Sequence, residues 1–124
     1  MSSVIAAGGD TGGIFAAIDA KDSASFVSYL TEDAIFRFGS APPVQGRDAI
    51  KAAVEGFFTS IAACSHDISN TLRQEDTLVC EGVVTYTRHD GSEIALPFTD
   101  VFEYEGSLIA HYKIYLDIGP LFAD

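Results

Sequence analysis

The sequence predicts an α+β fold in which about three helices, all from the N-terminal half, pack on one face of a curved antiparallel sheet. Two observations predict this fold. Apolar residues recur at helical spacing in the first half of the chain, whereas from His66 onward β-rich segments alternate with short polar or glycine-containing turns. Helices and strands are thus segregated along the chain, which is typical of α+β domains.

Three helices are predicted from the spacing of apolar side chains. A first short helix contains Ile14 and Ile18, and a second begins after Asp22 and Ser23, which favour helix N-termini. The third and longest spans residues 47–63, where apolar positions recur every three or four residues: Ile50, Val54, Phe57, Phe58 and Ile61. Each helix therefore has one apolar side to bury.

The strands are predicted from alternation and from turn residues. Residues 34–38 (AIFRF) form a short strand that ends at the turn residues 39–43. Four further segments follow from His66, separated by turns at 74–76, 90–91 and 105–107. These segments predict an antiparallel meander.

Composition limits the domain count and the partners. The 124 residues make one domain, 1–124, and 48% hydrophobic residues are enough for one core. The net charge of −11 excludes nucleic acid and anionic membranes as partners, since both would be repelled. We expect a cytoplasmic protein, because no apolar run could span a membrane and no basic residue precedes the first apolar stretch. Cys64 and Cys80 are expected to be buried thiols.

Strand pairing follows from the assumed turn lengths. If Asp90 and Gly91 form a two-residue turn, Glu81 lies opposite Asp100. The preceding turn then places Asn70 opposite Glu81 and His66 on the same face, and a three-residue turn at 105–107 brings Tyr112 opposite Asp100. The result is a row of polar side chains across one face of the sheet.

The neighbours of this row decide which face it occupies. They are almost all apolar, so the row is expected to face the helices: Ile68, Leu72, Val79, Val83, Phe98, Phe102, Ala110, Ile114 and Leu116. The opposite face is partly apolar as well, which predicts a homodimer through this outer sheet face: Cys80, Val84, Tyr86, Val101, Ile109 and Tyr115. An error of one residue in any turn would turn a strand over.

The sequence resembles the nuclear-transport-factor-2-like superfamily, which includes SnoaL-like polyketide cyclases, ketosteroid isomerases and limonene-epoxide hydrolases. The residues that carry the resemblance are FAAIDAKDSASFVSYLTEDAIFRF, VQGRDAIKAAVEGFF and DGSEIALPFTDVFEYEGSLIAHYKIYLDIGPLF. It implies a cone-shaped curved antiparallel sheet whose concave face, together with the helices, encloses a mostly apolar pocket. It also implies a dimer.

The resemblance transfers little catalytic machinery. Asp100, within PFTDVF, matches the ketosteroid isomerase aspartic acid that is held protonated to donate a hydrogen bond. The general base of those enzymes falls at Phe38 and their tyrosine near Ile14, so the isomerase set is incomplete. The epoxide hydrolase set is incomplete too, because its positions fall at or near Glu81, Val83, Ile114, Phe36 and Phe38. Only Asp117 lies near the cyclase aspartate.

Candidate catalytic residues are Asp100, His66 and Glu81. Two close carboxylates in a poorly hydrated pocket cannot both stay ionised, so one should have a raised pKa and serve as an acid. Glu81 or His66 is then the base that moves a proton next to a ligand carbonyl. Alternatively, these side chains only hydrogen-bond to one another. No metal and no cofactor are expected, since His89 lies in a turn and His111 on the outer face.

The expected ligand is a small apolar molecule, aromatic or polycyclic, in a phenylalanine-rich pocket. Two functions remain open at this point. The first is acid/base isomerisation, cyclisation or hydration, and the second is a non-catalytic ligand-binding or dimeric interaction module. The residues expected to contact the ligand are Phe36, Phe38, Asn70, Phe102, Tyr112 and Ile114.

Overall fold

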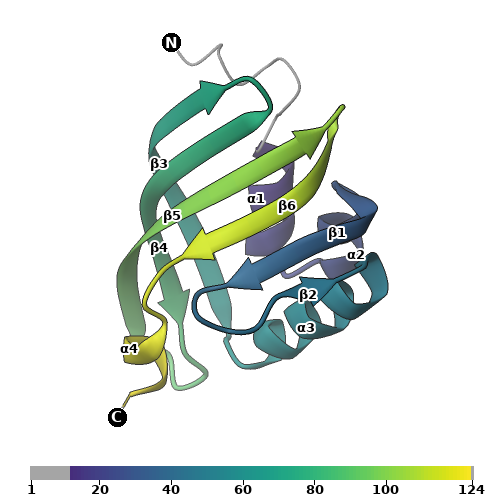
Figure 1. The fold of residues 1–124 in the computed structure, drawn as a ribbon. Coiled ribbons are helices and arrows are strands. Elements are labelled where there is room, and N and C mark those ends of the chain that lie inside the picture. Colours follow the sequence, from purple (N-terminus) through teal and green to yellow (C-terminus); the bar gives the residue numbers. More distant parts are fainter. Residues whose placement is uncertain (1–11, 124) are drawn as a thin grey trace.

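The computed structural model describes residues 12–123, which form one six-stranded sheet with helices packed against it (Figure 1). Residues 1–11 and 124 lie outside the described residues. They include the ends of the predicted domain 1–124 and the first apolar stretch, on which the expected cytoplasmic location partly depends. The elements are α1 (Gly12–Asp19), α2 (Ser23–Val27), β1 (Leu30–Phe38), β2 (Val44–Gln45), α3 (Arg47–Thr59), β3 (Ala63–Gln74), β4 (Thr77–Thr87), β5 (Glu93–Glu105), β6 (Leu108–Tyr115) and α4 (Gly119–Phe122).

The sheet has the strand order β2-β1-β6-β5-β4-β3. It is curved and open, so the predicted α+β class is confirmed. The sheet is not wholly antiparallel as predicted, because β1 runs parallel to β6. The strand β2 was expected to be loop and pairs with the outer edge of β1. The meander from β3 to β6 is antiparallel, as predicted.

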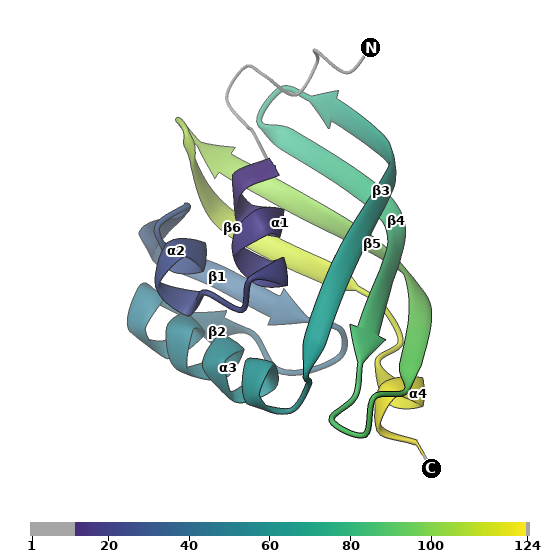
Figure 2. The ribbon, with the colours of Figure 1, turned by 180° about the vertical axis from the view of Figure 1, so that it is seen from behind.

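Helices α1, α2 and α3 lie on the concave side of the sheet (Figure 2). The Asp22 side chain caps α2 by accepting a hydrogen bond from the Ser25 N–H at 3.1 Å. Helix α3 buries Ile50, Val54 and Phe58 along one side and ends at Thr59, before the predicted end at residue 63. The apolar sides of the helices and the concave face thus enclose the core.

The hairpin between β4 and β5 corrects the predicted register. Its turn is one residue longer than assumed, since the Arg88 N–H donates to the Ser92 carbonyl at 2.8 Å and three residues lie between them. Asp100 therefore pairs with Cys80, not with Glu81. This shift turns β4 over, so Glu81 is exposed whereas Cys80, Val84 and Tyr86 are buried.

A β-bulge between Ile68 and Asn70 shifts the register of β3 by one residue. Beyond the bulge Asn70 pairs with Glu81, as predicted, and both are exposed on the outer face. Before the bulge His66 pairs with Val84 and faces the concave side. The longer turn reverses the faces of β4, and the bulge reverses the faces of β3 once more before it reaches His66. His66 therefore faces the concave side as predicted, although the register assumed for it was wrong.

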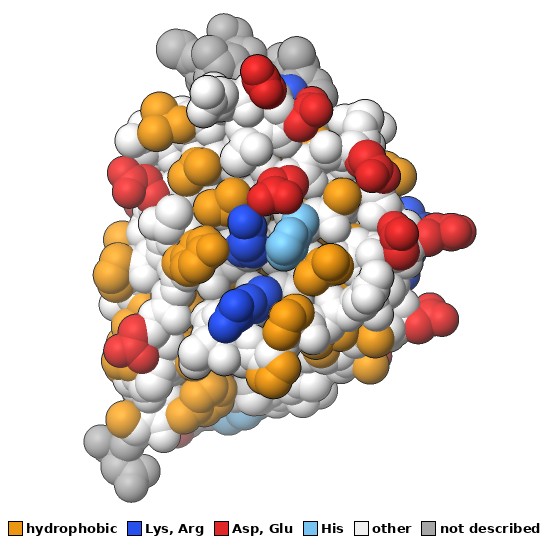
Figure 3. All heavy atoms as spheres, in the orientation of Figure 1, with side chains coloured by type: hydrophobic (Ala, Val, Ile, Leu, Met, Phe, Trp, Pro, Cys, Tyr) orange, Lys and Arg blue, Asp and Glu red, His pale blue; other side chains and the backbone are white. Residues whose placement is uncertain are grey.

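The outer face of the sheet is less apolar than expected, because Cys80, Val84, Tyr86 and Ile109 belong to the core. Basic side chains and a histidine lie near its centre, among separate hydrophobic groups (Figure 3). Glu103 accepts a hydrogen bond from Lys113 at 2.9 Å and pairs with His111 at 3.7 Å. The homodimer through this face stays a prediction.

None of the helices in residues 12–123 is long and apolar enough to cross a membrane. The cytoplasmic location stays a prediction.

Candidate functional site

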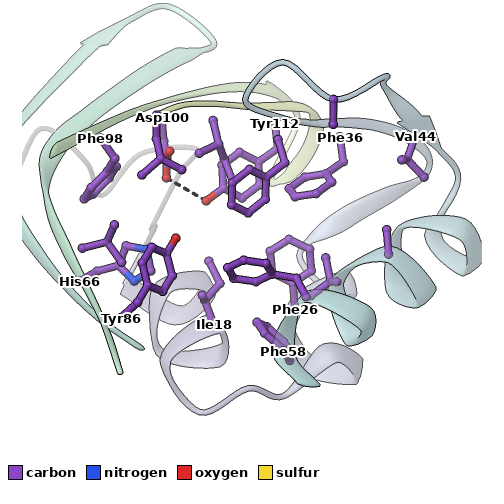
Figure 4. Close-up of a pocket in the computed structure, with 18 of the residues that line it drawn as sticks. Ile18, Phe26, Phe36, Val44, Phe58, His66, Tyr86, Phe98, Asp100 and Tyr112 are labelled. Carbon is purple, nitrogen blue, oxygen red and sulfur yellow. Dashed lines mark hydrogen bonds between the residues drawn. The ribbon is translucent and has the colours of Figure 1, made fainter. Parts of the chain in front are cut away.

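A cavity of about 230 Å³ lies between the concave face and the helices (Figure 4). Its polar lining comes from four adjacent strands: His66 from β3, Tyr86 from β4, Asp100 from β5 and Tyr112 from β6. The rest of the lining is apolar and includes Ile18, Phe26, Phe36, Phe38, Val44, Val54, Phe57, Phe58, Phe98, Ile114 and Leu116. The cavity is therefore an apolar chamber with polar groups gathered on the sheet side.

Asp100 is the most deeply buried ionisable side chain of the site except Tyr112, and 1% of its surface is exposed. Its Oδ2 accepts a hydrogen bond from the Tyr112 hydroxyl at 2.9 Å, whereas its Oδ1 has no partner among residues 12–123. Burial raises the pKa of Asp100 from 3.8 to about 7, and the hydrogen bond from Tyr112 opposes part of that rise. A substantial protonated fraction is thus present near neutral pH.

Tyr112 holds Asp100 in place from a rigid position. Its ring packs on Phe102 at a centroid distance of 4.4 Å and on Phe36 at 5.5 Å. Burial, followed by the nearby Asp100, raises the pKa of Tyr112 well above 10, so its hydroxyl stays a donor. Because Oδ2 accepts this bond, the proton of neutral Asp100 belongs on Oδ1. Asp100 pairs with Ile114 and not with Tyr112, as was predicted. Tyr112 lies two residues along β6 from that position, and so it still shares a face with Asp100.

His66 is oriented by a carboxylate that the sequence analysis missed. Its Nδ1 lies 2.6 Å from Asp19 Oδ1, and its backbone N–H donates to Asp19 Oδ2 at 3.1 Å. The ring also packs between Phe15 and Phe98, at 5.0 and 5.3 Å. In a neutral imidazole the carboxylate favours the hydrogen on Nδ1, and Nε2 is then an acceptor without a partner in the described part of the chain.

Cys64 completes the hydrogen bonding around Asp19. Its Sγ lies 3.7 Å from Asp19 Oδ1 and 3.5 Å from the Ile18 carbonyl. Burial and then Asp19 raise the pKa of the Cys64 thiol to about 12, so it acts as a donor.

Asp19, Cys64 and His66 are also residue types that bind Zn²⁺, and their ligand atoms lie within 4.8 Å of one another. The contacts that the structure shows between them are hydrogen bonds that orient the imidazole. The expected lack of a metal in this pocket stays a prediction.

The Asp19→Ala variant is expected to lose about 2 kcal/mol of unfolding free energy, because three donors lose their charged acceptor while partial exposure of the site lets water replace some of the bonds. Urea denaturation measures this loss. The control is Asp67→Ala, since Asp67 is exposed on the same strand as His66. Equal stability of the two variants would contradict the role of Asp19.

Tyr86 is a second site residue that the sequence analysis placed wrongly, on the outer face. Its ring is 4% exposed, and its hydroxyl points toward Asp100 across the chamber (Figure 4). Burial raises the pKa of Tyr86, with smaller contributions from Cys64 and Asp100, so the hydroxyl remains protonated. Cys80, Val84 and Tyr86 occupy alternate positions of β4, a pattern that indicates a buried face. The assumed turn length placed that face on the outside of the sheet.

The predicted pair of Glu81 and Asp100 does not form. Glu81 and Asn70 lie together on the outer face, where Asn70 Nδ2 donates to Glu81 Oε2 at 3.3 Å. The cause is the longer turn between β4 and β5, which turned Glu81 away from the chamber. The pKa of Asp100 is therefore raised by burial and not by a second carboxylate.

Four of the residues that were expected to contact a ligand line the chamber, and their contact with a ligand stays a prediction. Phe36, Phe38 and Ile114 line the chamber, together with Tyr112. Phe102 is fully buried behind Tyr112 and does not line the chamber, so it supports the tyrosine instead of contacting a ligand.

A family profile described as a SnoaL-like domain matches residues 13–112. The fold is also similar to that of an NTF2-like protein of unknown function from Burkholderia pseudomallei, with a TM-score of 0.79, 16% identity and 88% of each chain covered. A protein described as a SnoaL-like polyketide cyclase, from Shewanella denitrificans, gives a TM-score of 0.76 at 14% identity, again with 88% of each chain covered.

A third similar structure is that of TerC co-crystallized with polyporic acid. Its TM-score is 0.77 at 16% identity, with 88% of this chain and 89% of TerC covered. At such identities the three structural similarities establish the fold and not an activity.

Proposed function

The chain belongs to the SnoaL-like domain family, and we propose that its chamber binds a small neutral molecule and moves a proton on it. The observation that carries this proposal is the buried Asp100, which lines the chamber and whose Oδ1 has no hydrogen-bond partner among residues 12–123. A buried polar atom without a partner is costly, and a ligand oxygen that accepts its proton removes that cost.

The lining indicates the ligand class. Engineered apolar cavities of about 150 Å³ bind benzene, so a chamber of about 230 Å³ suits a two-ring molecule. The described residues of its lining include no lysine or arginine, which argues for a neutral ligand. The phenylalanine rings favour an aromatic or polycyclic one, and the co-crystallization of TerC with polyporic acid is consistent with an organic ligand in this fold.

The proposed step is proton removal next to a carbonyl group. His66 Nε2 accepts the proton from carbon, and the electron pair of the broken C–H bond forms a double bond as negative charge moves to the carbonyl oxygen. The Asp100 Oδ1 proton stabilises that oxygen through a hydrogen bond. Return of the proton at another carbon completes an isomerisation, and the same groups can assist cyclisation or hydration.

Exchange of carbon-bound hydrogen for deuterium in 2-tetralone tests this proposal. We expect the protein to accelerate exchange in D₂O, followed by NMR, and expect Asp100→Asn and His66→Gln each to lower the rate at least about 100-fold, a typical contribution of a general acid or base. The control is Glu81→Gln, which removes an exposed carboxylate from the outer face. Equal rates for all variants would overturn the assignment.

The alternative is a non-catalytic binding module. It is favoured by Phe36 and Phe38, two rings that line the chamber where the resemblance places the water-holding residues of epoxide hydrolases. Binding of 2-tetralone in calorimetry without any accelerated exchange would support this alternative over the enzyme.

A further inference from the structure

An open groove adjoins the chamber at the ends of β1 and β6. It lies between the turn that follows β1 and the segment from Tyr115 to Phe122. Four residues line both the groove and the chamber: Phe38, Ala41, Phe57 and Leu116. The two hollows therefore share a wall, and the groove adjoins the chamber that Asp100 lines.

Hydrogen bonds hold both walls of the groove. The Gly39 N–H donates to the Ile114 carbonyl at 2.8 Å, which fixes the turn after β1. On the other wall Arg88 donates to the Leu121 carbonyl at 3.0 Å and to the Pro120 carbonyl at 3.1 Å. Leu121 is 3% exposed, so α4 is anchored in the core. The groove is thus formed before any ligand arrives.

Two exposed aromatic side chains line the groove. Within residues 12–123 the large hydrophobic side chains that stay exposed are Leu72, Val83, Tyr115 and Phe122, and two of these line the groove. Phe122 is 58% exposed although its neighbour Leu121 is buried. Exposed apolar surface at a pocket mouth is typical of a binding site.

Phe38 and Phe57 lie between the chamber and the groove, with ring centroids 5.0 Å apart. An elongated ligand that occupies both hollows would therefore contact these two rings. The chamber alone holds about two rings, whereas the groove adds room for an extension.

We propose that the groove is a second subsite, which holds the apolar tail of an elongated ligand whose polar head lies against Asp100. This inference rests on the proposed function for the head group and adds the shape of the ligand. The tail is aliphatic or aromatic, because Phe122, Tyr115 and Leu116 are the surfaces that it contacts. Among the described residues of the lining, Arg37 is the one basic side chain and Asp117 the one acidic side chain, so the groove can also take a polar end of the tail.

Calorimetry with two probes tests the subsite. The probes are 2-naphthol, which fits the chamber, and 6-hexyl-2-naphthol, which carries a tail opposite its hydroxyl. We expect the hexyl probe to bind the unmodified protein at least about tenfold more tightly, since each buried methylene adds affinity. Phe122→Ala should weaken the hexyl probe about fivefold and leave 2-naphthol unchanged. Leu72→Ala, which removes an equally exposed side chain outside the groove, should change neither.

The outcomes separate the two proposals. Failure of 2-naphthol to bind overturns the chamber as a ligand site. Binding of 2-naphthol with equal responses of Phe122→Ala and Leu72→Ala to the hexyl probe overturns the groove alone. A change of sedimentation coefficient in Phe122→Ala without any change in probe affinity also overturns it, because the groove would then be an interface between two copies.

Discussion

Replacement of Asp100 by asparagine is expected to reduce the decrease in unfolding free energy that we expect between pH 4 and pH 8. The pKa of Asp100 is raised from 3.8 to about 7 in the fold, a difference of about 3 units. Between these values the folded protein keeps a proton that the unfolded chain has released, so the unfolding free energy falls as pH rises through this window and stays low above it. The total is on the order of 4 kcal/mol.

Asparagine carries no charge at either pH, so the variant should lack this part of the fall. Its amide also puts a donor near the position of Oδ1, which changes stability equally at both pH values and cancels in the comparison. Urea denaturation at pH 4 and pH 8 measures the difference, with Asp67→Asn as a change of the same chemistry at an exposed position. An unchanged pH dependence in Asp100→Asn would mean that Asp100 is not the buried acid on which the proposed function depends.

The sequence predicted the fold well, because its patterns report on burial. Helical spacing located α1, α2 and α3, and alternation located the meander. The parallel pairing of β1 with β6 was not predicted, since no local pattern identifies a partner strand that far along the chain. The cap at Asp22 was predicted, because it depends on residues that are adjacent in sequence.

The site was predicted only in part, because strand register depends on turn length. One extra residue in the turn between β4 and β5 moved Glu81 outward and Tyr86 inward. Asp100 kept its place, since both registers leave it on the concave face. Asp19 escaped detection for another reason: it lies at the end of α1, and the distance between a helix end and a strand follows from packing, which spacing in the sequence does not encode.

The second large effect concerns Gly82, the residue opposite the bulge in β3. Gly82→Ala is expected to lower the unfolding free energy by about 3 kcal/mol, the upper range of overpacking. An added Cβ would overlap the Asp67 carbonyl oxygen and would lie 3.0 Å from the Asp67 carbonyl carbon and from the Ile68 Cα. All three are backbone atoms, so no side-chain rotation can relieve the contact. The bulged segment itself must move.

The bulge is also what lets β3 place His66 inside and Asn70 outside. A shift of this segment therefore loosens the contact of His66 with Asp19, and the His66 ring signals in NMR should move along with the loss of stability. Gly56→Ala is the matched control, because a Cβ at that exposed position of α3 meets nothing within 4 Å. This control substitution should raise the unfolding free energy by about 0.5 to 1 kcal/mol, the usual advantage of alanine over glycine within a helix. If Gly82→Ala were as stable as Gly56→Ala, the close approach of β4 to the bulge, and with it the physical basis for the inward placement of His66, would be wrong.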